Sequence, residues 1–290
     1  MIDFKNIAVV TTAKNESKNI DKLVDGIIKQ NGIKTWVFID DNSDDNTLVA
    51  LHNRYSDIEK YVENFIVINL DSNDNYELGP KYSKNIKLGF DHIIDFEVSN
   101  SIIHEFFAIL DADNFIENGY YSNLISEFRR DSTLGIASGK TVFIIDDKMV
   151  DSNESNRWAA GSNRVWRRDC LLQSGYLISY SADAVSAARA RSYGWKVCSF
   201  SSAKVFAREV GERVGQEYYG RSCYIRHVPF YFVLLSAVVQ VLKGRFHVAS
   251  GLIRGFNQAK RVNENRITDE LAIKYFQLYL YNNIKERLSD

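Results

Sequence analysis

The sequence predicts an α/β fold built on a doubly wound, mostly parallel β-sheet, and three observations support this prediction. Short apolar runs rich in β-branched residues alternate with amphipathic helical patterns along the first part of the chain. The run at residues 106–110 is apolar without interruption, as expected of a strand buried on both faces. It ends on two carboxylates, Asp111 and Asp113, at the edge where open α/β sheets bind ligands.

The predicted strands and helices follow one another in order. Buried strands are expected at residues 7–12, 36–39, 65–70 and 106–110. A helix is expected after each of the first three strands, at residues 20–28, from 43–47 onward and at 86–94. Right-handed crossovers would then connect the parallel strands.

Beyond the paired carboxylates the pattern is more mixed. A helix is expected around residues 121–128, followed by a hairpin or two antiparallel strands at 134–138 and 141–145. An alanine-rich helix over 182–193 and a strand at 195–200 come next. We therefore predict one α/β domain over residues 1–205 and an extension over residues 206–290.

The extension combines a loop with basic helices. Residues 208–226 are polar and contain three glycines, which predicts a mobile loop. Helical segments are expected at 230–242, 246–259 and 268–288. Residues 204–290 hold 14 Lys and Arg against 8 Asp and Glu, whereas residues 1–203 hold 22 against 29. A basic, amphipathic tail suits a peripheral contact with an anionic membrane, and also a homodimer interface or packing against the first domain.

The composition argues against several classes of protein. A net charge of −1 gives no support for nucleic-acid binding. Cys170, Cys198 and Cys223 show neither metal-ligand nor disulfide spacing, which indicates buried thiols in a reducing compartment. No signal peptide is visible, and the longest apolar stretch, residues 229–242, is too short to span a bilayer. We therefore expect a cytoplasmic protein.

The paired carboxylates are candidate metal ligands. Side chains two apart on an extended chain point to the same side, so Asp111 and Asp113 can reach one site. Paired hard oxygen ligands suit Mg²⁺ or Mn²⁺, which would take further ligands from water and substrate phosphates. The alternative is a turn capped by acidic residues, because Asp is common where strands end.

Four short motifs occur in order along the chain. The first strand ends in TTAKNE (residues 11–16), and the second ends in FIDDNSDDNT (38–47). ILDAD (109–113) and RARSYGWKV (189–197) follow. Together these motifs resemble the family 2 inverting glycosyltransferases, which have the GT-A fold and carry D-D-G-S-x-D-x-T and D-x-D motifs at corresponding places. The tail also resembles the C-terminal helical extension of membrane-associated members.

The resemblance implies a nucleotide-sugar donor and a divalent cation, Mg²⁺ or Mn²⁺, as cofactor. Asp113 would be the direct metal ligand, and Asp111 would lie near the ribose and the metal. Asp41 would accept a hydrogen bond from the base, and Asp40 competes for that role because a shift of one residue would exchange them. The other residues that the resemblance places near the nucleotide are Thr11, Ala13 and Glu16.

Basic side chains supply further candidates. Lys81 or Lys84 would face a phosphate, although residues 80–85 fit the family's G-K-G-x-x-x-N stretch loosely and a surface lysine is the commoner outcome. Three arginines are expected either to contact a phosphate or to form an exposed face, namely Arg164, Arg167 and Arg168. The family often has a histidine ligand where this chain has residues 206–208, which implies fewer protein ligands for the metal.

An inverting transfer needs a base that deprotonates the acceptor hydroxyl. Alignment on residues 189–194 places Asp183 at the second carboxylate of the family's Glu-Asp pair, whereas Ala182 replaces the first. Asp183 is therefore the predicted catalytic base. The alternative is an ordinary residue at a helix N-terminus, where the helix dipole favours a carboxylate.

The resemblance thus predicts a glycosyltransferase that moves one sugar to a hydroxyl of a glycan or lipid-linked acceptor, with inversion, at the cytoplasmic face of a membrane. Residues 1–205 would bind donor and acceptor, and residues 206–290 would contact the membrane or a second subunit. A polyprenyl-phosphate glycosyltransferase is the alternative within the fold. A haloacid dehalogenase-type phosphatase and an inactive nucleotide-binding module are alternatives from other classes.

Overall fold

A nine-stranded mixed sheet forms the centre of the computed structural model, which describes residues 6–71, 79–145, 148–151, 155–208 and 216–288. The strand order is β3-β2-β1-β4-β8-β6-β9-β5, and β7 pairs with β6. The strands are β1 (Ile7–Ala13), β2 (Ile33–Asp40), β3 (Asn64–Asn69), β4 (Phe106–Ile109), β5 (Asn114–Ile116), β6 (Leu134–Ile145), β7 (Lys148–Asp151), β8 (Arg164–Arg167) and β9 (Lys196–Arg208). The first four run parallel, and β8 lies antiparallel between β4 and β6.

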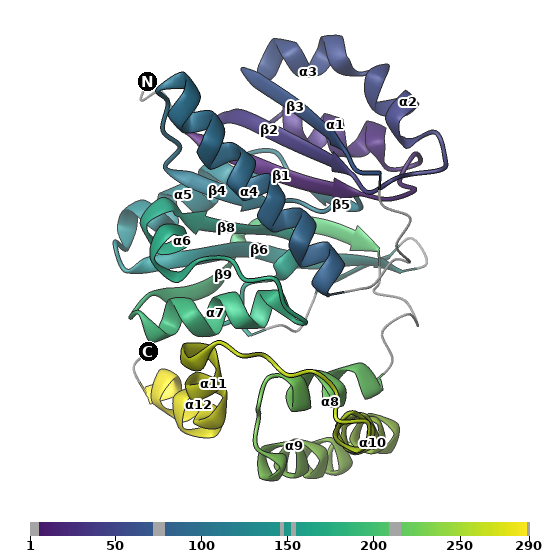
Figure 1. The fold of residues 1–290 in the computed structure, drawn as a ribbon, viewed down its shortest axis with the longest axis vertical. Coiled ribbons are helices and arrows are strands. Elements are labelled where there is room, and N and C mark those ends of the chain that lie inside the picture. Colours follow the sequence, from purple (N-terminus) through teal and green to yellow (C-terminus); the bar gives the residue numbers. More distant parts are fainter. Residues whose placement is uncertain (1–5, 72–78, 146–147, 152–154, 209–215, 289–290) are drawn as a thin grey trace.

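Helices cover both faces of the sheet (Figure 1). The helices on one face are α1 (Ile20–Ile28), α2 (Thr47–His52), α3 (Tyr55–Tyr61) and α5 (Tyr120–Arg130). Those on the other face are α4 (Pro80–Asn100), α6 (Arg168–Ser174) and α7 (Ala182–Ser192). The predicted doubly wound α/β fold is therefore confirmed, and parallel β1, β2 and β4 end at the same edge of the sheet.

The central strand β4 is buried from both sides, as its sequence predicts. Phe106 and Ala108 pack into the core on the α1 face, whereas Phe107 and Ile109 pack into the core on the α4 face. Strand residues alternate between faces, so a strand between two helical layers needs apolar residues at every position.

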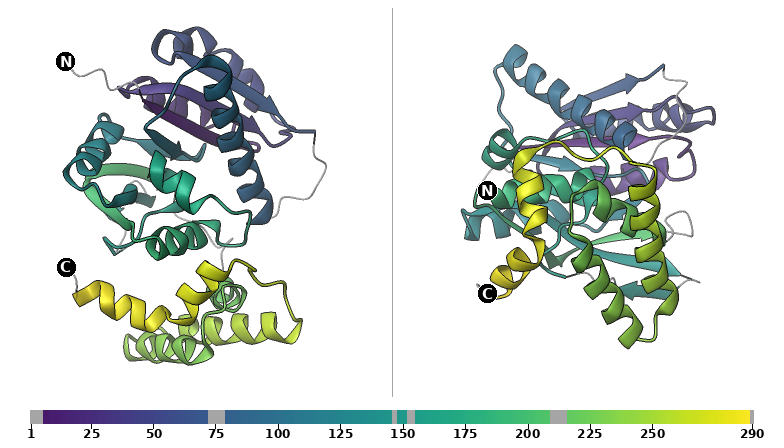
Figure 2. Two further views of the ribbon diagram at one scale, coloured as in Figure 1. Left: turned by 60° about the vertical axis from the view of Figure 1, so that its left-hand side comes forward. Right: turned by 60° about the horizontal axis from the view of Figure 1, so that its bottom comes forward.

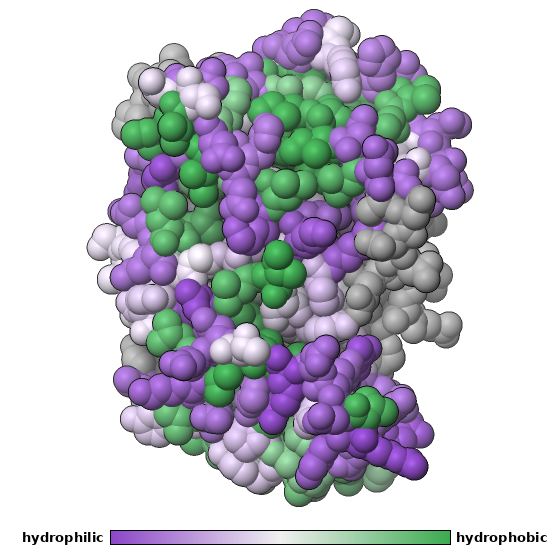
Figure 3. Space-filling view, in the orientation of Figure 1, coloured by the Kyte–Doolittle hydropathy of each residue, from purple (hydrophilic) through white to green (hydrophobic). Residues whose placement is uncertain are grey.

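The edge strand β3 is less completely covered. Its apolar residues Ile66 and Ile68 are only half-buried beside α4. Figure 3 shows apolar side chains gathered beside α4 in the upper part of the view. The sheet is therefore partly open at its β3 edge, away from the central strand.

The hairpin predicted over residues 134–145 is wrong, because these residues form one long strand, β6. A register shift between Gly139 and Lys140 marks a bulge near the expected turn. The Tyr120 hydroxyl accepts a hydrogen bond from the Gly139 N–H at 2.8 Å, and a Cβ at residue 139 would collide with the Tyr120 ring. Gly139 therefore accommodates a close aromatic neighbour and does not form a hairpin turn.

The described residues of the tail form five helices, which lie below the sheet in Figure 1 and come forward in the right-hand view of Figure 2. They are α8 (Gln216–Ile225), α9 (Phe230–Leu242), α10 (Phe246–Arg261), α11 (Glu270–Gln277) and α12 (Tyr279–Leu288). The third predicted helical segment is thus divided at Leu278. Within the described part of the chain, none of the helices combines the length and apolar character that a membrane span requires.

The predicted loop over residues 208–226 is corrected in part, because α8 occupies its second half and residues 209–215 lie outside the described residues. Gly220 contributed to the loop prediction, yet a Cβ there would collide with the backbone of α10 at Leu252. A Cβ at Gly255 of α10 would likewise collide with the Glu217 carbonyl. The two glycines therefore allow α8 and α10 to cross at backbone contact distance.

Candidate active site

Two loops at the carboxyl ends of β1 and β2 are held together by polar side chains. The Asn15 N–H donates to Ser43 Oγ, and Asn15 Oδ1 accepts from the Asp44 N–H, both at 3.0 Å. The Glu16 N–H donates to Thr47 Oγ1 at 2.8 Å. Asn15 adopts a φ of 59°, a conformation that asparagine tolerates better than most residues. The polar residues after both strands therefore fix the shape of this edge.

Asp40 and Asp41 have different partners. Asp40 is buried and accepts hydrogen bonds from the Ser43 N–H at 2.9 Å and from Ser43 Oγ at 2.6 Å. Asp41 is also buried, and its Oδ1 lies 3.1 Å from Nζ of Lys81, in the first turn of α4. Lys84 lies one turn further along α4 and is exposed. Asp40 is therefore occupied by its own loop, whereas Asp41 connects β2 to α4.

The carboxylate pair lies in a turn between β4 and β5. The Asn114 N–H donates to the Asp111 carbonyl at 3.0 Å and closes the turn. The Asp111 N–H donates to the Ser162 carbonyl at 2.8 Å. Because β5 pairs with β9 and not with the neighbours of β4, the chain has to change direction here. The predicted extended presentation of Asp111 and Asp113 is therefore wrong, and a turn carries both carboxylates.

Asp111 has other carboxylates as its charged neighbours. Burial raises the pKa of Asp111 to about 8, although its Oδ1 accepts a hydrogen bond from the Tyr82 hydroxyl at 2.5 Å. The negative charges of Asp113 and Glu16 raise this pKa further. Two neighbouring carboxylates therefore oppose the ionisation of Asp111.

This donor set fits a divalent cation. Asp111 and Asp113 offer hard oxygen ligands, and a cation between them would offset the repulsion that raises the pKa of Asp111. Within the described residues, no group of three or more His, Cys, Asp or Glu side chains is arranged to hold a metal ion. A site with two protein carboxylates suits Mg²⁺ or Mn²⁺, because these ions readily keep water and substrate phosphates as further ligands.

Asp183 lies in the first turn of α7, beside the short helix η1 (Gly161–Asn163). A Cβ at Gly161 would lie 3.0 Å from Cβ of Asp183, so the glycine leaves room for this side chain. The next residue, Ser162, carries the carbonyl that holds Asp111. Asp183 and the carboxylate pair therefore flank the same short segment, although they lie far apart in the sequence.

Arg164 supports this segment from inside the molecule. It is fully buried, and its Nη1 donates to the Asp183 carbonyl at 2.7 Å, while its Nη2 donates to the Ala159 carbonyl. Arg167 also donates to backbone carbonyls, and Arg168 binds a buried carboxylate at the opposite end of the sheet. The exposed arginine face considered from the sequence is therefore wrong, and these arginines bind groups of the protein itself.

The remaining nucleotide candidates lie on β1 or directly after it. Thr11 is fully buried, and its Oγ1 accepts a hydrogen bond from Nε1 of Trp36 at 3.0 Å, so its hydroxyl is engaged in the core. The Ala13 carbonyl accepts from the Asp41 N–H at 2.8 Å and joins the two strand ends. Of these candidates, the Glu16 carboxyl lies within electrostatic range of the carboxylate pair.

Two tyrosines complete the site, and sequence motifs did not identify them. Tyr82, beside the lysines considered at the start of α4, donates its hydrogen bond to Asp111. Tyr176 is buried, which raises its pKa, and the charges of Asp183 and Asp111 act on it in the same direction. Tyr176 therefore lies within electrostatic range of both Asp111 and Asp183.

The tail helix α8 reaches the segment that carries Asp183. The Tyr218 hydroxyl is hydrogen-bonded to Ser181, and Ser222 Oγ contacts Ser181 Oγ. Ser181 precedes α7 with a φ of 52°, which is uncommon for serine. Burial raises the pKa of Tyr218, and so does the charge of Asp183. The tail therefore supplies one side of the surroundings of Asp183.

Comparisons with known proteins identify the fold. No protein-family model and no curated protein sequence matches the chain. S. aureus TarS 1–349 is 15% identical with a TM-score of 0.54, over 89% of this chain and 73% of that chain. The mannosyltransferase PcManGT from Pyrobaculum calidifontis, solved with GDP-Man and Mn²⁺, is 13% identical with a TM-score of 0.56, over 98% and 80%.

A further similar structure comes from a larger protein. GalNAc-T7, solved with UDP, GalNAc and Mn²⁺, is 13% identical with a TM-score of 0.55, over 99% of this chain and 58% of that chain. At identities this low the likeness establishes the fold alone. The chain has the fold of the GT-A glycosyltransferases.

Proposed function

We propose that this chain is an inverting glycosyltransferase that moves one sugar from a nucleoside diphosphate sugar to a hydroxyl of a glycan or lipid-linked acceptor. The observation that carries the proposal is the placement of Asp183 and the carboxylate pair on either side of the Gly161–Asn163 segment in a GT-A fold. Similar folds solved with GDP-Man and Mn²⁺, or with UDP-GlcNAc, support this proposal.

Asp113 and Asp111 are the proposed ligands of Mg²⁺ or Mn²⁺. When bound, the cation supplies Lewis-acid stabilisation of the departing diphosphate. Asp111 has a pKa of about 8 without metal, so it has to release a proton when it becomes a ligand. The hydrogen bond from Tyr82 holds the Asp111 carboxyl in place during this change.

The strand ends of β1 and β2 are the proposed nucleotide site. We assign the contact with the base to Asp41, because the Ser43 backbone and hydroxyl already occupy both oxygens of Asp40. Lys81, which pairs with Asp41, then stands closer to the nucleotide than exposed Lys84 does. Thr11 and Ala13 shape the floor of this site through the backbone, since the Thr11 hydroxyl binds Trp36.

Asp183 is the proposed base that accepts the proton of the attacking hydroxyl. It lies in the first turn of α7, beside the Gly161–Asn163 segment, whose Ser162 carbonyl binds the Asp111 N–H. An acceptor that already carries a phosphate charge needs less help from a base. An Asp183→Asn variant that keeps its activity would therefore favour the alternative of a polyprenyl-phosphate glycosyltransferase.

The assignment of the tail extends the proposal to cellular location. We propose that residues 1–205 form the catalytic unit and residues 206–290 the contact unit, although β9 continues to Arg208. A location on the cytoplasmic face of a membrane follows from the same hypothesis, with a homodimer as the alternative.

A thermal-shift screen of nucleoside diphosphates with and without Mn²⁺ tests the proposal. A ligand at a hundred times its Kd stabilises the folded state by about 2.7 kcal/mol, which raises the melting temperature by several degrees. We expect one base to stabilise the protein most, and most strongly with Mn²⁺. Asp113→Ala should remove the part that depends on Mn²⁺, whereas the control Asp95→Ala, on exposed α4 surface, should keep it.

Two outcomes would contradict the proposal. The first is that none of the common nucleoside diphosphates changes the melting temperature of the wild-type protein. The second is a Mn²⁺-dependent shift that survives Asp113→Ala, which would place the metal elsewhere. Glycosyl transfer from the sugar derivative of the selected nucleotide then tests the reaction itself.

A further inference from the structure

The outer face of α9 carries a continuous stripe of exposed apolar side chains. Leu235 is 51% exposed, Val238 55% and Leu242 81%. The stripe, called the α9 stripe below, comprises Tyr231, Leu234, Leu235, Val238, Val239 and Leu242. These positions recur every three or four residues, so they share one face of the helix along its whole length.

The opposite face of α9 is already used for packing. Val233 and Ala237 are buried, and Val233 belongs to a core with Tyr224 of α8 and Phe256 of α10. Because α8 and α10 touch through their glycines, the platform beneath α9 is tightly packed. The α9 stripe is therefore presented on an ordered support and is not the inner face of a displaced helix.

The surroundings of the α9 stripe are basic. Residues 229–263 contain no Asp or Glu, but they contain Lys243, Arg245, Arg254, Lys260 and Arg261. Lys243 and Arg245 are exposed directly beyond the end of α9, next to Phe246, which is 66% exposed. An apolar stripe that ends in exposed cations complements a surface that is apolar inside and negatively charged outside.

The length of α9 decides how it meets such a surface. A helix of 13 residues is about 20 Å long, which is shorter than the hydrocarbon core of a bilayer at about 30 Å. The helix also has its second face committed to α8 and α10. It therefore fits the interface of one leaflet, parallel to the membrane plane.

A second copy of this chain is the rival occupant of the α9 stripe. In a symmetric dimer the same patch serves both subunits. Residues 229–263 of the second copy would supply no carboxylate to pair with Lys243 and Arg245. The charge pattern therefore favours an anionic lipid surface over self-association.

We propose that the α9 stripe, together with Lys243 and Arg245, binds peripherally to an anionic lipid leaflet. This inference concerns a surface separate from the carboxylate site and holds whether or not the chain transfers a sugar. It assigns the membrane contact to one helix and one set of side chains. It also predicts that binding needs both the apolar stripe and the cations.

Co-sedimentation of the full chain with lipid vesicles tests this proposal. We expect binding to vesicles of phosphatidylcholine with phosphatidylglycerol, weaker binding to phosphatidylcholine alone, and a decrease at high salt. Lys243→Glu with Arg245→Glu should weaken binding about tenfold or more, since each cation near an anionic surface contributes about 1 kcal/mol. Lys18→Glu with Lys29→Glu, on exposed α1-side surface, is the charge-matched control and should bind normally.

A second pair of variants isolates the apolar contribution. Val238→Asp with Leu242→Asp should abolish vesicle binding without unfolding the protein, because both side chains are mostly exposed. Val98→Asp, at an equally exposed apolar residue of α4, is the matched control. Circular dichroism and melting temperature verify that each variant is folded.

The outcomes decide between the two occupants. Loss of binding in both α9 variant pairs, with normal binding in both controls, supports the proposal. Absence of wild-type binding to anionic vesicles at low salt overturns it. A wild-type dimer in light scattering that Leu242→Asp converts to a monomer, without any vesicle binding, would show that a second copy covers the stripe.

Discussion

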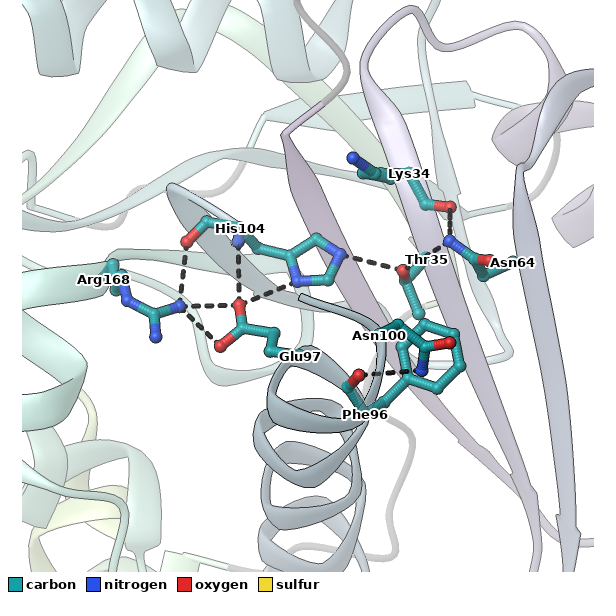
Figure 4. A network of polar contacts seen from close by, with 8 residues as sticks. All are labelled: Lys34, Thr35, Asn64, Phe96, Glu97, Asn100, His104 and Arg168. Atoms are coloured by element: carbon teal, nitrogen blue, oxygen red, sulfur yellow. Dashed lines mark hydrogen bonds and ion pairs between the residues drawn. The ribbon is translucent and has the colours of Figure 1, made fainter. Parts of the chain in front are cut away.

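A carboxyl group lies near each end of the central sheet, and the two have opposite surroundings. Beyond the carboxyl end of β4, Asp111 faces Asp113 and Glu16, and its pKa rises to about 8. Before the amino end of β4, Glu97 of α4 lies beside His104 and Arg168 (Figure 4). The first carboxyl lies among like charges, whereas the second has an opposite charge and several hydrogen-bond donors.

Glu97, His104 and Arg168 have hydrogen-bond partners in one network. Glu97 Oε1 accepts from the His104 N–H at 2.7 Å and from His104 Nδ1 at 2.9 Å, while Arg168 Nη1 donates to both oxygens at 2.6 and 2.7 Å. Burial opposes ionisation of Glu97, but these hydrogen bonds lower its pKa. Burial lowers the pKa of His104, so the neutral ring donates from Nδ1 and accepts from Thr35 Oγ1 at Nε2.

The direction of the pKa shift therefore separates two uses of a carboxyl group that has limited access to solvent. A lowered pKa marks a carboxylate whose charge the protein already neutralises, as in a structural network. A raised pKa marks a carboxyl group that still needs a partner, as at a ligand site. Both groups lie next to β4, so proximity to the central strand does not distinguish them.

The largest expected effect comes from removing the satisfied carboxylate. Glu97→Ala leaves the Arg168 charge and the His104 donors without their partner, so the free energy of unfolding should fall by about 3–5 kcal/mol. Asp111→Asn should leave it unchanged or raised in metal-free buffer, because the protein no longer has to bind the proton that Asp111 takes up on folding. Urea denaturation measures both.

The same urea denaturation experiment can contradict this difference between Glu97 and Asp111. Asp91→Asn, which disrupts an exposed pair with Lys87 on α4, serves as the surface control and should cost less than about 1 kcal/mol. If Glu97→Ala behaves like this control while Asp111→Asn strongly destabilises the protein, then Asp111, and not Glu97, is the carboxyl group that stabilises the fold.

The second effect is a dependence of stability on pH that differs between the two carboxyl groups. Asp111 changes from an ordinary value of 3.8 to about 8 on folding, so the folded state binds the extra proton between about pH 4 and 8. Stability should therefore fall as pH rises through this window, by at most about 1.4 kcal/mol per pH unit. Asp111→Asn should remove this slope in metal-free buffer.

Glu97 acts in the opposite direction. Its pKa is lowered from 4.5, so its contribution is complete above about pH 4.5 and is lost as pH falls through the lowered value. The difference in unfolding free energy between wild type and Glu97→Gln should therefore stay constant from pH 5 to 8. A constant difference between wild type and Asp111→Asn over the same range would show that Asp111 titrates normally.

The third prediction concerns the hydrogen bond that Asp111 does possess. The hydrogen bond from the Tyr82 hydroxyl lowers the pKa of Asp111. Tyr82→Phe should therefore raise this pKa, so that a proton competes more strongly with the metal for the Asp111 carboxyl group. Affinity for Mn²⁺ at pH 6.5, measured by electron paramagnetic resonance of the free ion, should weaken by up to about tenfold. The loss should shrink at pH 8.5, where protons compete less. An equal loss at both pH values would mean that Tyr82 acts on the geometry and not on the proton.

Much of this arrangement follows from local sequence, and the exceptions share a cause. The apolar run at β4 acts close to its own place in the chain, so its pattern predicted a buried strand. The polar residues after β1 and β2 were recognised as motifs, although their hydrogen bonds join the two loops. The bulge at Gly139 depends on Tyr120, and the surroundings of Asp183 depend on Tyr218 of the tail. Such contacts between distant segments leave no periodic signal in either segment.

The arginines are a second case in which the sequence did not predict the contacts that the fold forms. A cluster of basic residues predicts either a ligand or solvent, but Arg164 binds the carbonyls of Ala159 and Asp183 in the interior. Sequence alone does not show which backbone carbonyls the fold brings within reach of a buried arginine. A buried guanidinium, with donors in several directions, can satisfy such carbonyls from different segments together.

The smallest expected effect compares two serines with the same backbone conformation at opposite ends of the sheet. Ser101, at the end of α4 between Glu97 and His104, has a φ of 54°, and Ser181, before Asp183, has a φ of 52°. Glycine adopts this conformation without a Cβ penalty, so Ser101→Gly should raise the free energy of unfolding by about 0.5–1 kcal/mol. Ser181→Gly should bring no such gain, because it also removes the hydroxyl that contacts Ser222 and Tyr218.

A matched substitution in α4 controls for the general effect of glycine. Ser99→Gly, in the last turn of the same helix, should lower the free energy of unfolding by up to about 0.5–1 kcal/mol, because glycine has a lower helix propensity than serine. Urea denaturation of the three variants then separates backbone strain from hydroxyl contacts. If Ser181→Gly stabilises the protein as much as Ser101→Gly does, the contacts from α8 contribute nothing to holding Asp183. The tail would then border the site without supporting it.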